Sequence, residues 1–173
     1  VPALQAAVDD GDIGAINYVS VPGRDGIPAW IDHALAMRDA GRELPFAIVS
    51  NDRVVGSTRF YDIDLATPSL AIGYTFHSAS VWRSHVNTAN KRLMLGHAFD
   101  TLGAQSVFFH TSHLNLRSRA AIERLGATLD GILRACWGQV PKAGWRGGDS
   151  AVARAPLADA NGSLSRRDVV PVG

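Results

Sequence analysis

The chain has 173 residues, of which 46% are hydrophobic and 19% charged, and its formal net charge is +1. This length predicts one domain with a sizeable core, and the nearly balanced charge argues against a nucleic-acid partner. No apolar run approaches the roughly 20 residues that a membrane-spanning helix needs. The single cysteine excludes an internal disulfide and fits a reducing compartment. We therefore expect a cytoplasmic α/β or α+β domain with no membrane partner.

Hydrophobic periodicity and turn residues divide residues 2–136 into helices and strands. In chain order the predicted elements are helix 2–9, helix 27–41, strand 45–50, strand 54–64, strand 70–77, helix 88–102, strand 106–111, helix 115–126 and strand 127–136. Pro2 lies in a first helical turn, and Gly41 and Gly126 end their helices. A bulge is expected at Gly131. This order favours a mixed sheet with helices on its faces, and the first two strands form a hairpin.

The pattern changes after residue 136. Residues 137–173 are rich in Gly and Pro and contain two tryptophans, one of them Trp137. We expect residues 1–136 to form the core domain, and we leave open whether a first strand precedes Val1. The remaining residues would form a divergent segment that packs on the same domain or on a second subunit. Two segments compete for the last strand of the sheet, 149–155 and 167–172.

The stretch VWRSHVNTANKR, residues 81–92, joins a predicted strand to a predicted helix, which begins at Asn87 or Thr88. Backbone N–H groups at a helix start bind anions, and Arg83 or Lys91 would add positive charge. The turn therefore suits a pyrophosphate. An ordinary strand-to-helix turn with an Asn or Thr cap would have a similar composition.

A second stretch, HTSHLNLRSRAAIERLGATLDGILR at residues 110–134, predicts a strand, a helix and another strand. Together with AIGYTF, RSHVNT and HAFDTLG, it resembles the GNAT superfamily of acetyl-CoA-dependent N-acetyltransferases. More closely, it resembles the RimJ/RimL-like branch of ribosomal-protein N-terminal acetyltransferases. The resemblance covers roughly residues 4–135, and its specific motifs lie within 70–135. It implies the GNAT fold with splayed central strands, acetyl-CoA as cosubstrate and no metal.

The resemblance also implies roles for particular residues. The third strand would bind the pantetheine arm of acetyl-CoA, and the turn after it would bind the pyrophosphate. The implied cofactor-binding residues are Tyr74, Thr75, Phe76, Arg83, Ser84, His85, Val86, Asn87, Thr88, Asn115 and Ser118. Asn115 would touch the pantetheine or orient its loop. The Ser118 hydroxyl would protonate the leaving thiolate, unless Ser118 is only a first-turn residue that bonds the backbone.

Three departures from the family pattern bear on function. His85 stands where the turn usually has Gly, so its side chain would crowd the phosphates or add a donor. Ala71 stands where relatives often carry a Glu that can act as a general base through water. The segment after residue 136 replaces the short turn and final strand of the relatives.

Without that Glu, histidines become the candidate bases, because imidazole titrates near neutral pH. We expect His77 and His110 to be catalytic, since they lie on the two strands that splay, and His113 to contact the acceptor. Each of them could equally be a surface residue or pack on the cofactor. Asp62 and Asp64 are expected to hold a cationic acceptor, unless they are solvated hairpin residues.

The expected acceptor is a small polyamine or an aminoglycoside-type antibiotic. Its apolar face would stack on Trp137 while carboxylates bind its ammonium groups. Members of the family also acetylate protein N-termini, so the α-amine of a (ribosomal) protein is the first alternative. The second alternative is a degenerate, non-catalytic domain that binds CoA or a partner, because the Glu and the turn Gly are missing. A homodimer formed through the C-terminal segment stays open.

Overall fold

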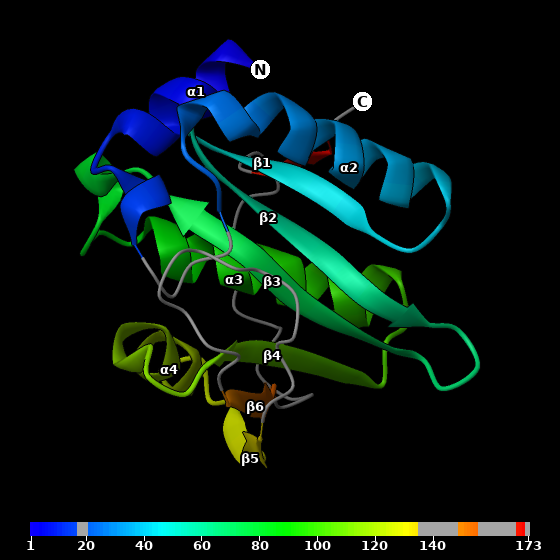
Figure 1. Ribbon diagram of the computed structural model, residues 1–173. Helices are drawn as coiled ribbons and strands as arrows, with labels where there is room; N and C mark the ends of the chain where they lie inside the picture. The colour runs from blue at the N-terminus through cyan, green and yellow to red at the C-terminus, as the bar shows by residue number, and fades with distance from the viewer. Residues whose placement is uncertain (17–20, 135–148, 156–168, 172–173) are drawn as a thin grey trace.

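The computed structural model of the chain describes residues 1–16, 21–134, 149–155 and 169–171 (Figure 1). Its helices are α1 (Pro2–Asp9), α2 (Ile27–Asp39), α3 (Val86–Gly96), the π-helical turn η4 (His97–Thr101) and α4 (Leu116–Glu123), with short 3₁₀ turns η1 (Ile13–Ala15), η2 (Arg24–Gly26) and η3 (Ala79–Val81). Its strands are β1 (Leu44–Ser50), β2 (Arg53–Asp64), β3 (Ser69–His77), β4 (Ser106–Ser112), β5 (Thr128–Leu133), β6 (Ser150–Arg154) and β7 (Val169–Pro171).

Every helix and strand predicted between residues 2 and 136 is present, with small differences at the ends. The helix after the polar turn begins at Val86, one residue before the earliest predicted start. Its continuation is π-helical, because the Leu102 N–H bonds the His97 carbonyl five residues earlier. Gly41 and Gly126 have φ of 70° and 82°, the left-handed conformation expected where helices end.

The seven strands of the described residues form one mixed sheet in the order β5-β6-β4-β3-β2-β1-β7. β1 and β2 form the predicted hairpin, β3 pairs antiparallel with β2, and β3 and β4 run parallel. β6 lies between β4 and β5, while β7 pairs with β1 at the opposite side of the sheet. Both segments that competed for the last strand are therefore strands. The register shift between Leu129 and Gly131 confirms the predicted bulge.

Helices cover both faces of the sheet, each over its own apolar core, as Figure 1 shows for α1 and α2 against α3. Phe60, Met94 and Phe109 are buried in the larger core, which includes α3. Val8 and Phe76 are buried in the second core, which includes α1 and α2. Removal of this apolar surface from water is the main term that stabilises the fold. The mixed α/β architecture predicted from the sequence is confirmed.

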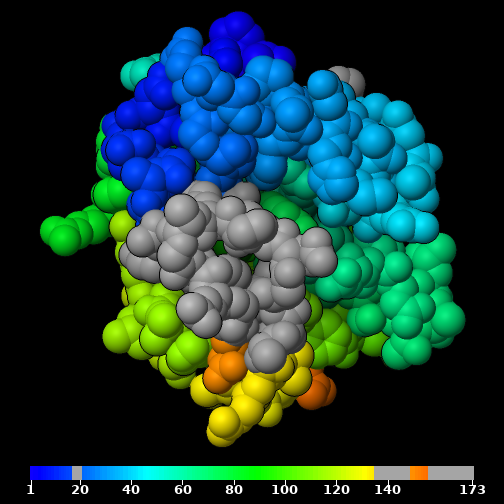
Figure 2. Space-filling model, viewed as in Figure 1, coloured from blue at the N-terminus to red at the C-terminus, as the bar shows by residue number. Residues whose placement is uncertain are grey.

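The N-terminal helices and the α4–β5 region lie apart on the molecular surface. Figure 2 shows the first helices (blue) at one end of the visible face, and α4 with β5 (yellow-green and yellow) at the other end. Within the described ranges, no helix is long and apolar enough to cross a bilayer. Trp137, which the sequence assigned to the acceptor, lies outside the described residues.

Candidate active site

β3 and β4 pair only where they begin. Residues 69–71 lie opposite residues 106–108, and the described structure has no β3–β4 pairing beyond Ala71 and Phe108. The two strands then diverge toward the ends that carry His77 and Ser112 (Figure 1). We call the space between the diverging strands the β3–β4 gap; among the described residues, the two strands form no ladder with each other along it. The splayed central strands predicted from the sequence are confirmed.

A bulge in β3 lies at the edge of this gap. Gly73 pairs with Arg59 and Phe76 pairs with Ser57, so two residues of β3 oppose one residue of β2. Tyr74 is the distorted residue, with φ of 51°, a conformation that costs a non-glycine residue about 1 kcal/mol or more. The bulge directs Tyr74 toward the α2 face of the sheet and the next residue, Thr75, toward α3.

Aromatic side chains gather on the α2 face beside the gap. The Tyr61 ring meets the Tyr74 ring edge-on at 5.2 Å and the His110 ring at 5.8 Å between centroids. Tyr61 lies directly over Gly73, where an added Cβ would come within 2.6 Å of the phenol ring. The exposed Asp62 follows Tyr61 in β2. These four residues, Tyr61, Asp62, Tyr74 and His110, are called the Tyr61 cluster below.

Burial and the Asp62 carboxylate set the protonation of this cluster. Burial raises the pKa of Tyr61, and the negative charge of Asp62 raises it further. Burial also raises the pKa of Tyr74, with Glu43 adding to the effect and Arg59 opposing it. Burial lowers the pKa of His110, which Asp62 partly offsets. At neutral pH the cluster therefore consists of two neutral phenols, a neutral imidazole and a carboxylate.

Arg59 supports the cluster from within the core. Its side chain is 1% exposed, and its guanidinium pairs with the Glu43 carboxylate at 2.9 Å. The same guanidinium donates to the Trp30 carbonyl at 3.2 Å, and its Cζ lies 4.0 Å from the Trp30 ring centroid and 4.6 Å from that of Tyr74. These contacts fix the Tyr74 ring on one side. Sequence reasoning missed Arg59, because β2 carries other charged residues and its sequence does not show which of them is buried.

The polar turn between β3 and α3 uses part of the predicted donor set for itself, because the Ser84 N–H and hydroxyl donate to the Val81 carbonyl and the Val86 N–H donates to the Ser84 hydroxyl. Arg83 has φ of 59°, and the side chains of Arg83, Ser84 and His85 are exposed. The first bond of α3 runs from the Ala89 N–H to the His85 carbonyl, so the N–H groups of Asn87 and Thr88 have no acceptor within the helix. Such groups bind anions.

The start of α4 faces this turn. The Asn115 carboxamide caps the helix by accepting from the Ser118 N–H at 3.0 Å. The Arg117 guanidinium lies 4.3 Å from the Trp82 ring centroid, and Trp82 donates to the His77 carbonyl at 2.7 Å. This contact joins the chain after β3 to the chain after β4 at the open end of the gap.

Lys91 and His77 lie on the α3 side of β3. Lys91 donates to the Thr75 hydroxyl at 2.7 Å, so its ammonium group is turned into the protein and away from the polar turn. The suggestion that Lys91 adds charge at a pyrophosphate is therefore wrong, while Arg83 remains available. Burial lowers the pKa of His77 to about 3, with smaller contributions from Lys91 and Arg117. Such a low pKa makes His77 a poor proton acceptor.

Two other predicted residues lie in turns. The Asp64 carboxylate accepts from the Ala66 and Thr67 N–H groups at 2.8 and 3.2 Å, which is a turn-forming role in the β2–β3 hairpin. The His113 ring contacts the Asp149 carbonyl at 3.0 Å. Neither Asp64 nor His113 takes part in the ring contacts of the Tyr61 cluster, so those contacts do not group them with the candidate acceptor site.

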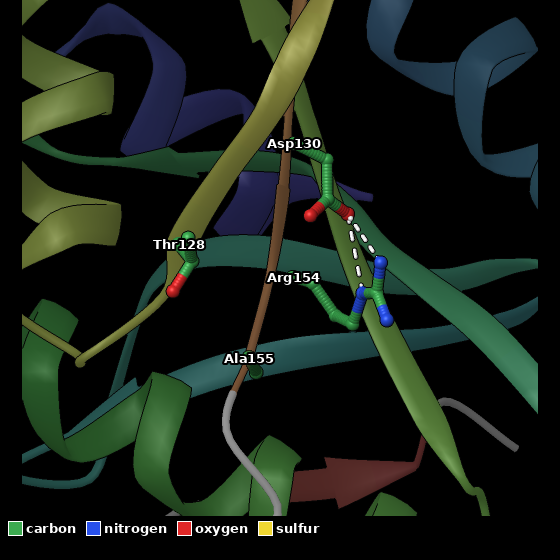
Figure 3. Close-up of a pocket in the computed structure, with 4 residues that line it drawn as sticks. All are labelled: Thr128, Asp130, Arg154 and Ala155. Atoms are coloured by element: carbon green, nitrogen blue, oxygen red, sulfur yellow. Dashed lines mark hydrogen bonds and ion pairs between the residues drawn. The ribbon is translucent and has the colours of Figure 1, made fainter.

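A separate pocket lies at the far side of the sheet, lined by Thr128, Asp130, Arg154 and Ala155 (Figure 3). Arg154 donates twice to Asp130 there, each time at 3.2 Å. The Arg154 guanidinium also lies 5.9 Å from the Phe108 ring centroid, at the end of β4 where the strands still pair. The pocket is thus remote from the open end of the gap. Among the described residues, no group of His, Cys, Asp and Glu side chains could hold a metal ion.

The chain is similar to known proteins in sequence and in structure. The model of a family described as an acetyltransferase (GNAT) domain matches residues 4–128. A GCN5-related N-acetyltransferase from Brucella melitensis matches with a TM-score of 0.78 and 24% identity, over 91% of this chain and 71% of that one. RimJ from Mycobacterium smegmatis, in complex with CoA-disulfide, matches with a TM-score of 0.73 and 18% identity, over 88% and 75% of the two chains.

RimL, a ribosomal L7/L12 alpha-N-protein acetyltransferase, matches with a TM-score of 0.73 and 15% identity, over 88% of this chain and 82% of RimL. At these identities the solved structures establish a shared fold. No curated protein matches the chain.

Proposed function

Because the chain belongs to the GNAT acetyltransferase family, we propose that it acetylates a primary amine of a small molecule that carries further positive charge. Acetyl-CoA supplies the acetyl group as a thioester. The amine nitrogen forms a bond to the acetyl carbon, and the bond from that carbon to sulfur breaks. The attacking amine loses a proton, and the departing thiolate gains one. The protein has to bind both substrates and accommodate these two proton transfers.

The polar turn supports the cofactor half of this proposal. The N–H groups of Asn87 and Thr88 lack acceptors within α3, and the neighbouring Arg83 is exposed. Helix-start N–H groups and a guanidinium are the donors that bind phosphate oxygens. His85 replaces the usual Gly, but its side chain is exposed, so it can add a donor without filling the turn.

The Tyr61 cluster is the observation that carries the acceptor half. Neutral aromatic rings with a carboxylate beside them attract an ammonium group through the ring faces and through direct charge. Tyr74 belongs to the bulge at the gap and His110 to the strand across it. An amine held by the cluster would therefore be beside the thioester.

Two side chains are suited to the proton transfers. His110 has a pKa lowered by burial, so it is neutral at pH 7 and can accept the amine proton. Ser118 follows the Asn115 cap at the open end of the gap. Among the described residues its hydroxyl forms no hydrogen bond, which leaves it available to the thiolate.

The test is a thiol-release assay with acetyl-CoA and three groups of acceptors: polyamines, aminoglycosides, and peptides with free N-termini. We expect kcat/KM to be highest for acceptors with two or more positive charges. A preference for peptides would instead indicate acetylation of protein α-amines. If acetyl-CoA at millimolar concentration neither raises the Tm nor releases thiol with any amine, the chain is a non-catalytic member of the family.

Asp62→Asn and Asp64→Asn form a matched pair for the acceptor site. Asn tolerates the φ of 49° at Asp62, and it can keep the turn that Asp64 forms, so both variants should fold. We expect Asp62→Asn to raise KM for a polycationic acceptor about twofold to fivefold, the size of a lost contact between exposed charges. Asp64→Asn should leave that KM unchanged, and neither variant should alter KM for acetyl-CoA.

A further inference from the structure

Lys91 extends from α3 to a position beneath the β3–β4 gap. Its Nζ lies 2.7 Å from the Thr75 hydroxyl on β3 and 5.7 Å from the Phe109 ring centroid on β4. Both residues come after Ala71 and Phe108, the last pair that joins these strands. The ammonium group is therefore located between the diverging strands, on the face of the sheet opposite the Tyr61 cluster.

A lysine at this position does not serve stability. Its side chain is buried at 6% exposure, and burial lowers its pKa from the usual 10.5 to about 7. A buried charge is destabilising unless strong pairing offsets its lost hydration, and an apolar side chain of similar length would suit the α3 core better. Lys91 also precedes the buried Leu95 by one helical turn, where the helix pattern calls for an apolar residue. A buried, costly charge beside a candidate reaction site is therefore a candidate for a functional role.

Thr75 connects Lys91 to the bulge. The Thr75 hydroxyl accepts from Lys91, contacts the Thr58 hydroxyl at 2.8 Å and donates to the Gly73 carbonyl at 3.3 Å. The Thr75–Gly73 hydrogen bond spans Tyr74, the residue with positive φ. A protonated Lys91 can only donate to Thr75, which leaves the Thr75 proton for Gly73 or Thr58, whereas a neutral amine can also accept that proton.

Other buried polar atoms surround this chain of hydrogen bonds. Among the described residues, the Asn90 carboxamide and the His77 Nε2 are buried with no hydrogen-bond partner. The charges of Lys91 and of Arg117 on α4 both act on His77 and lower its pKa further. At pH 7 His77 is neutral and Lys91 is about half protonated, so the positive charge of this region comes from Arg117 and from the protonated form of Lys91. Positive charge there favours negative charge in the gap above it.

We propose that Lys91 is a positioning residue for acetyl transfer: through Thr75 it holds the bulge at residues 73–76 in place, and in its protonated form it places a positive charge beneath the thioester. This role rests on the proposed acetyl transfer and adds a residue to it. The charge stabilises the acetyl oxygen and the CoA sulfur as they become negative, and both atoms carry more negative charge in the transition state than in acetyl-CoA. Lys91 therefore contributes to kcat more than to binding of acetyl-CoA.

The first test compares Lys91→Met with Arg92→Met, which removes an exposed positive charge from the next position of the same helix. We expect Lys91→Met to lower kcat at least about tenfold, the effect of a lost charge-assisted interaction. KM for acetyl-CoA should change little, and the Tm should be equal or higher. Arg92→Met should leave kcat unchanged. A lysine with a purely structural role would give the opposite result for Lys91→Met, a lower Tm with an unchanged kcat.

The second test asks whether Lys91 acts through Thr75. Thr75→Val removes the hydroxyl and keeps the shape of the side chain, whereas Thr75→Ser keeps the hydroxyl. We expect Thr75→Val to lower kcat as Lys91→Met does, and Thr75→Ser to stay within about threefold of the parent protein. If the valine variant keeps full kcat while Lys91→Met loses it, the connection through Thr75 is wrong.

The third test does not depend on activity. The chain has two lysines, Lys91 and Lys142, so protein labelled with ¹³C and ¹⁵N in lysine gives two side-chain signals, which Lys91→Met assigns. We expect the Lys91 signal to titrate near pH 7 and to shift when CoA is added. A protein that acetylates no amine contradicts the proposed function. If CoA still shifts the Lys91 signal in that case, the result supports the position of Lys91 beneath the cofactor site. A Lys91 signal that titrates near 10.5 and ignores CoA overturns the inference.

Discussion

Arg59 is a charged residue enclosed by the core, and Glu43 is its counter-ion. The pair is nearly inaccessible to water, with side-chain exposures of 1% and 10%. Breaking such a pair on one side leaves an unpaired charge in a medium of low dielectric constant, which costs far more than an exposed ion pair contributes. The Trp30 and Tyr74 rings that flank Arg59 add attraction for the cation.

Glu43→Gln should therefore be strongly destabilising. We expect the free energy of unfolding to fall by about 3–5 kcal/mol, because Arg59 would stay buried without its counter-ion. Denaturation by urea, followed by tryptophan fluorescence, measures the change. Arg59→Met combined with Glu43→Gln should recover much of the loss, since it removes both charges. A double variant less stable than Glu43→Gln would show that the guanidinium itself, rather than charge balance, is required.

Ser118 and Asn115 are adjacent in space but differ in their expected roles. Ser118→Ala should lower kcat and leave the Tm nearly unchanged, because only its backbone N–H bonds the cap. Asn115→Ala should instead lower stability by about 1 kcal/mol through loss of the helix cap. Steady-state kinetics and thermal unfolding of both variants separate the two effects. An unchanged kcat in Ser118→Ala would remove the serine from the proposed mechanism.

At the scale of elements, the start of α3 is the helix end that we propose to bind the pyrophosphate of acetyl-CoA. Its first N–H groups have no internal acceptors, and the exposed turn before it carries Arg83. Backbone donors cannot be removed by ordinary side-chain changes, so proline is the useful probe. Proline fits the first turn of a helix, because the N–H it lacks is not needed there for the helix.

Asn87→Pro should weaken acetyl-CoA binding about tenfold, the effect of one lost hydrogen bond to a charged group. Asn87→Ala is the matched control, because it removes the same side chain and keeps the N–H group. Calorimetric titration with CoA measures both affinities. Equal affinities in the two variants would mean that this N–H does not contact the pyrophosphate.

Much of the fold could be read from the sequence, because local patterns determine it. Apolar periodicity and glycine positions predicted each element from α1 to β5, and the motif resemblance predicted the splayed strands. The place of the C-terminal strands could not be read, since β6 inserts between β4 and β5 and β7 pairs with β1, which are contacts over long sequence distances. Neither pairing leaves a periodic signal distinct from that of any short strand.

The candidate site was only partly predictable for a similar reason. His110, Asp62 and Tyr74 were named from the sequence, but their grouping around Tyr61 depends on a bulge that shifts the side-chain alternation of β3. Lys91 was expected at the phosphates because it follows the polar turn. Helical geometry instead turns it inward, three and four residues before the buried Met94 and Leu95.

At the scale of the whole molecule, buried basic groups make stability depend on pH. Burial lowers the pKa of Lys91 to about 7 and that of His77 to about 3. In the unfolded chain these groups titrate near their usual values of 10.5 and 6.5. Between the folded and unfolded pKa of each group, the unfolded state binds more protons, so stability rises with pH.

We therefore expect the free energy of unfolding to increase between pH 7 and 10, by up to about 1.4 kcal/mol per pH unit from Lys91 alone. Urea denaturation at several pH values measures the slope. Lys91→Met should remove the slope above pH 7, and His77→Gln should reduce the loss of stability between pH 6.5 and 3. A wild-type protein with constant stability from pH 7 to 9.5 would contradict the burial of a titrating lysine.

The pairing of β7 with β1 has a consequence for synthesis on the ribosome. β1 and β2 can form their hairpin as soon as residue 64 is made, but the outer edge of β1 finds its partner only at residues 169–171. For more than a hundred residues of translation, that edge presents unpaired backbone donors and acceptors. Exposed edges of this kind recruit strands from other chains. The nascent protein should thus be most prone to aggregate in the interval before its last strand arrives, and slower translation of the C-terminal segment should lengthen that interval.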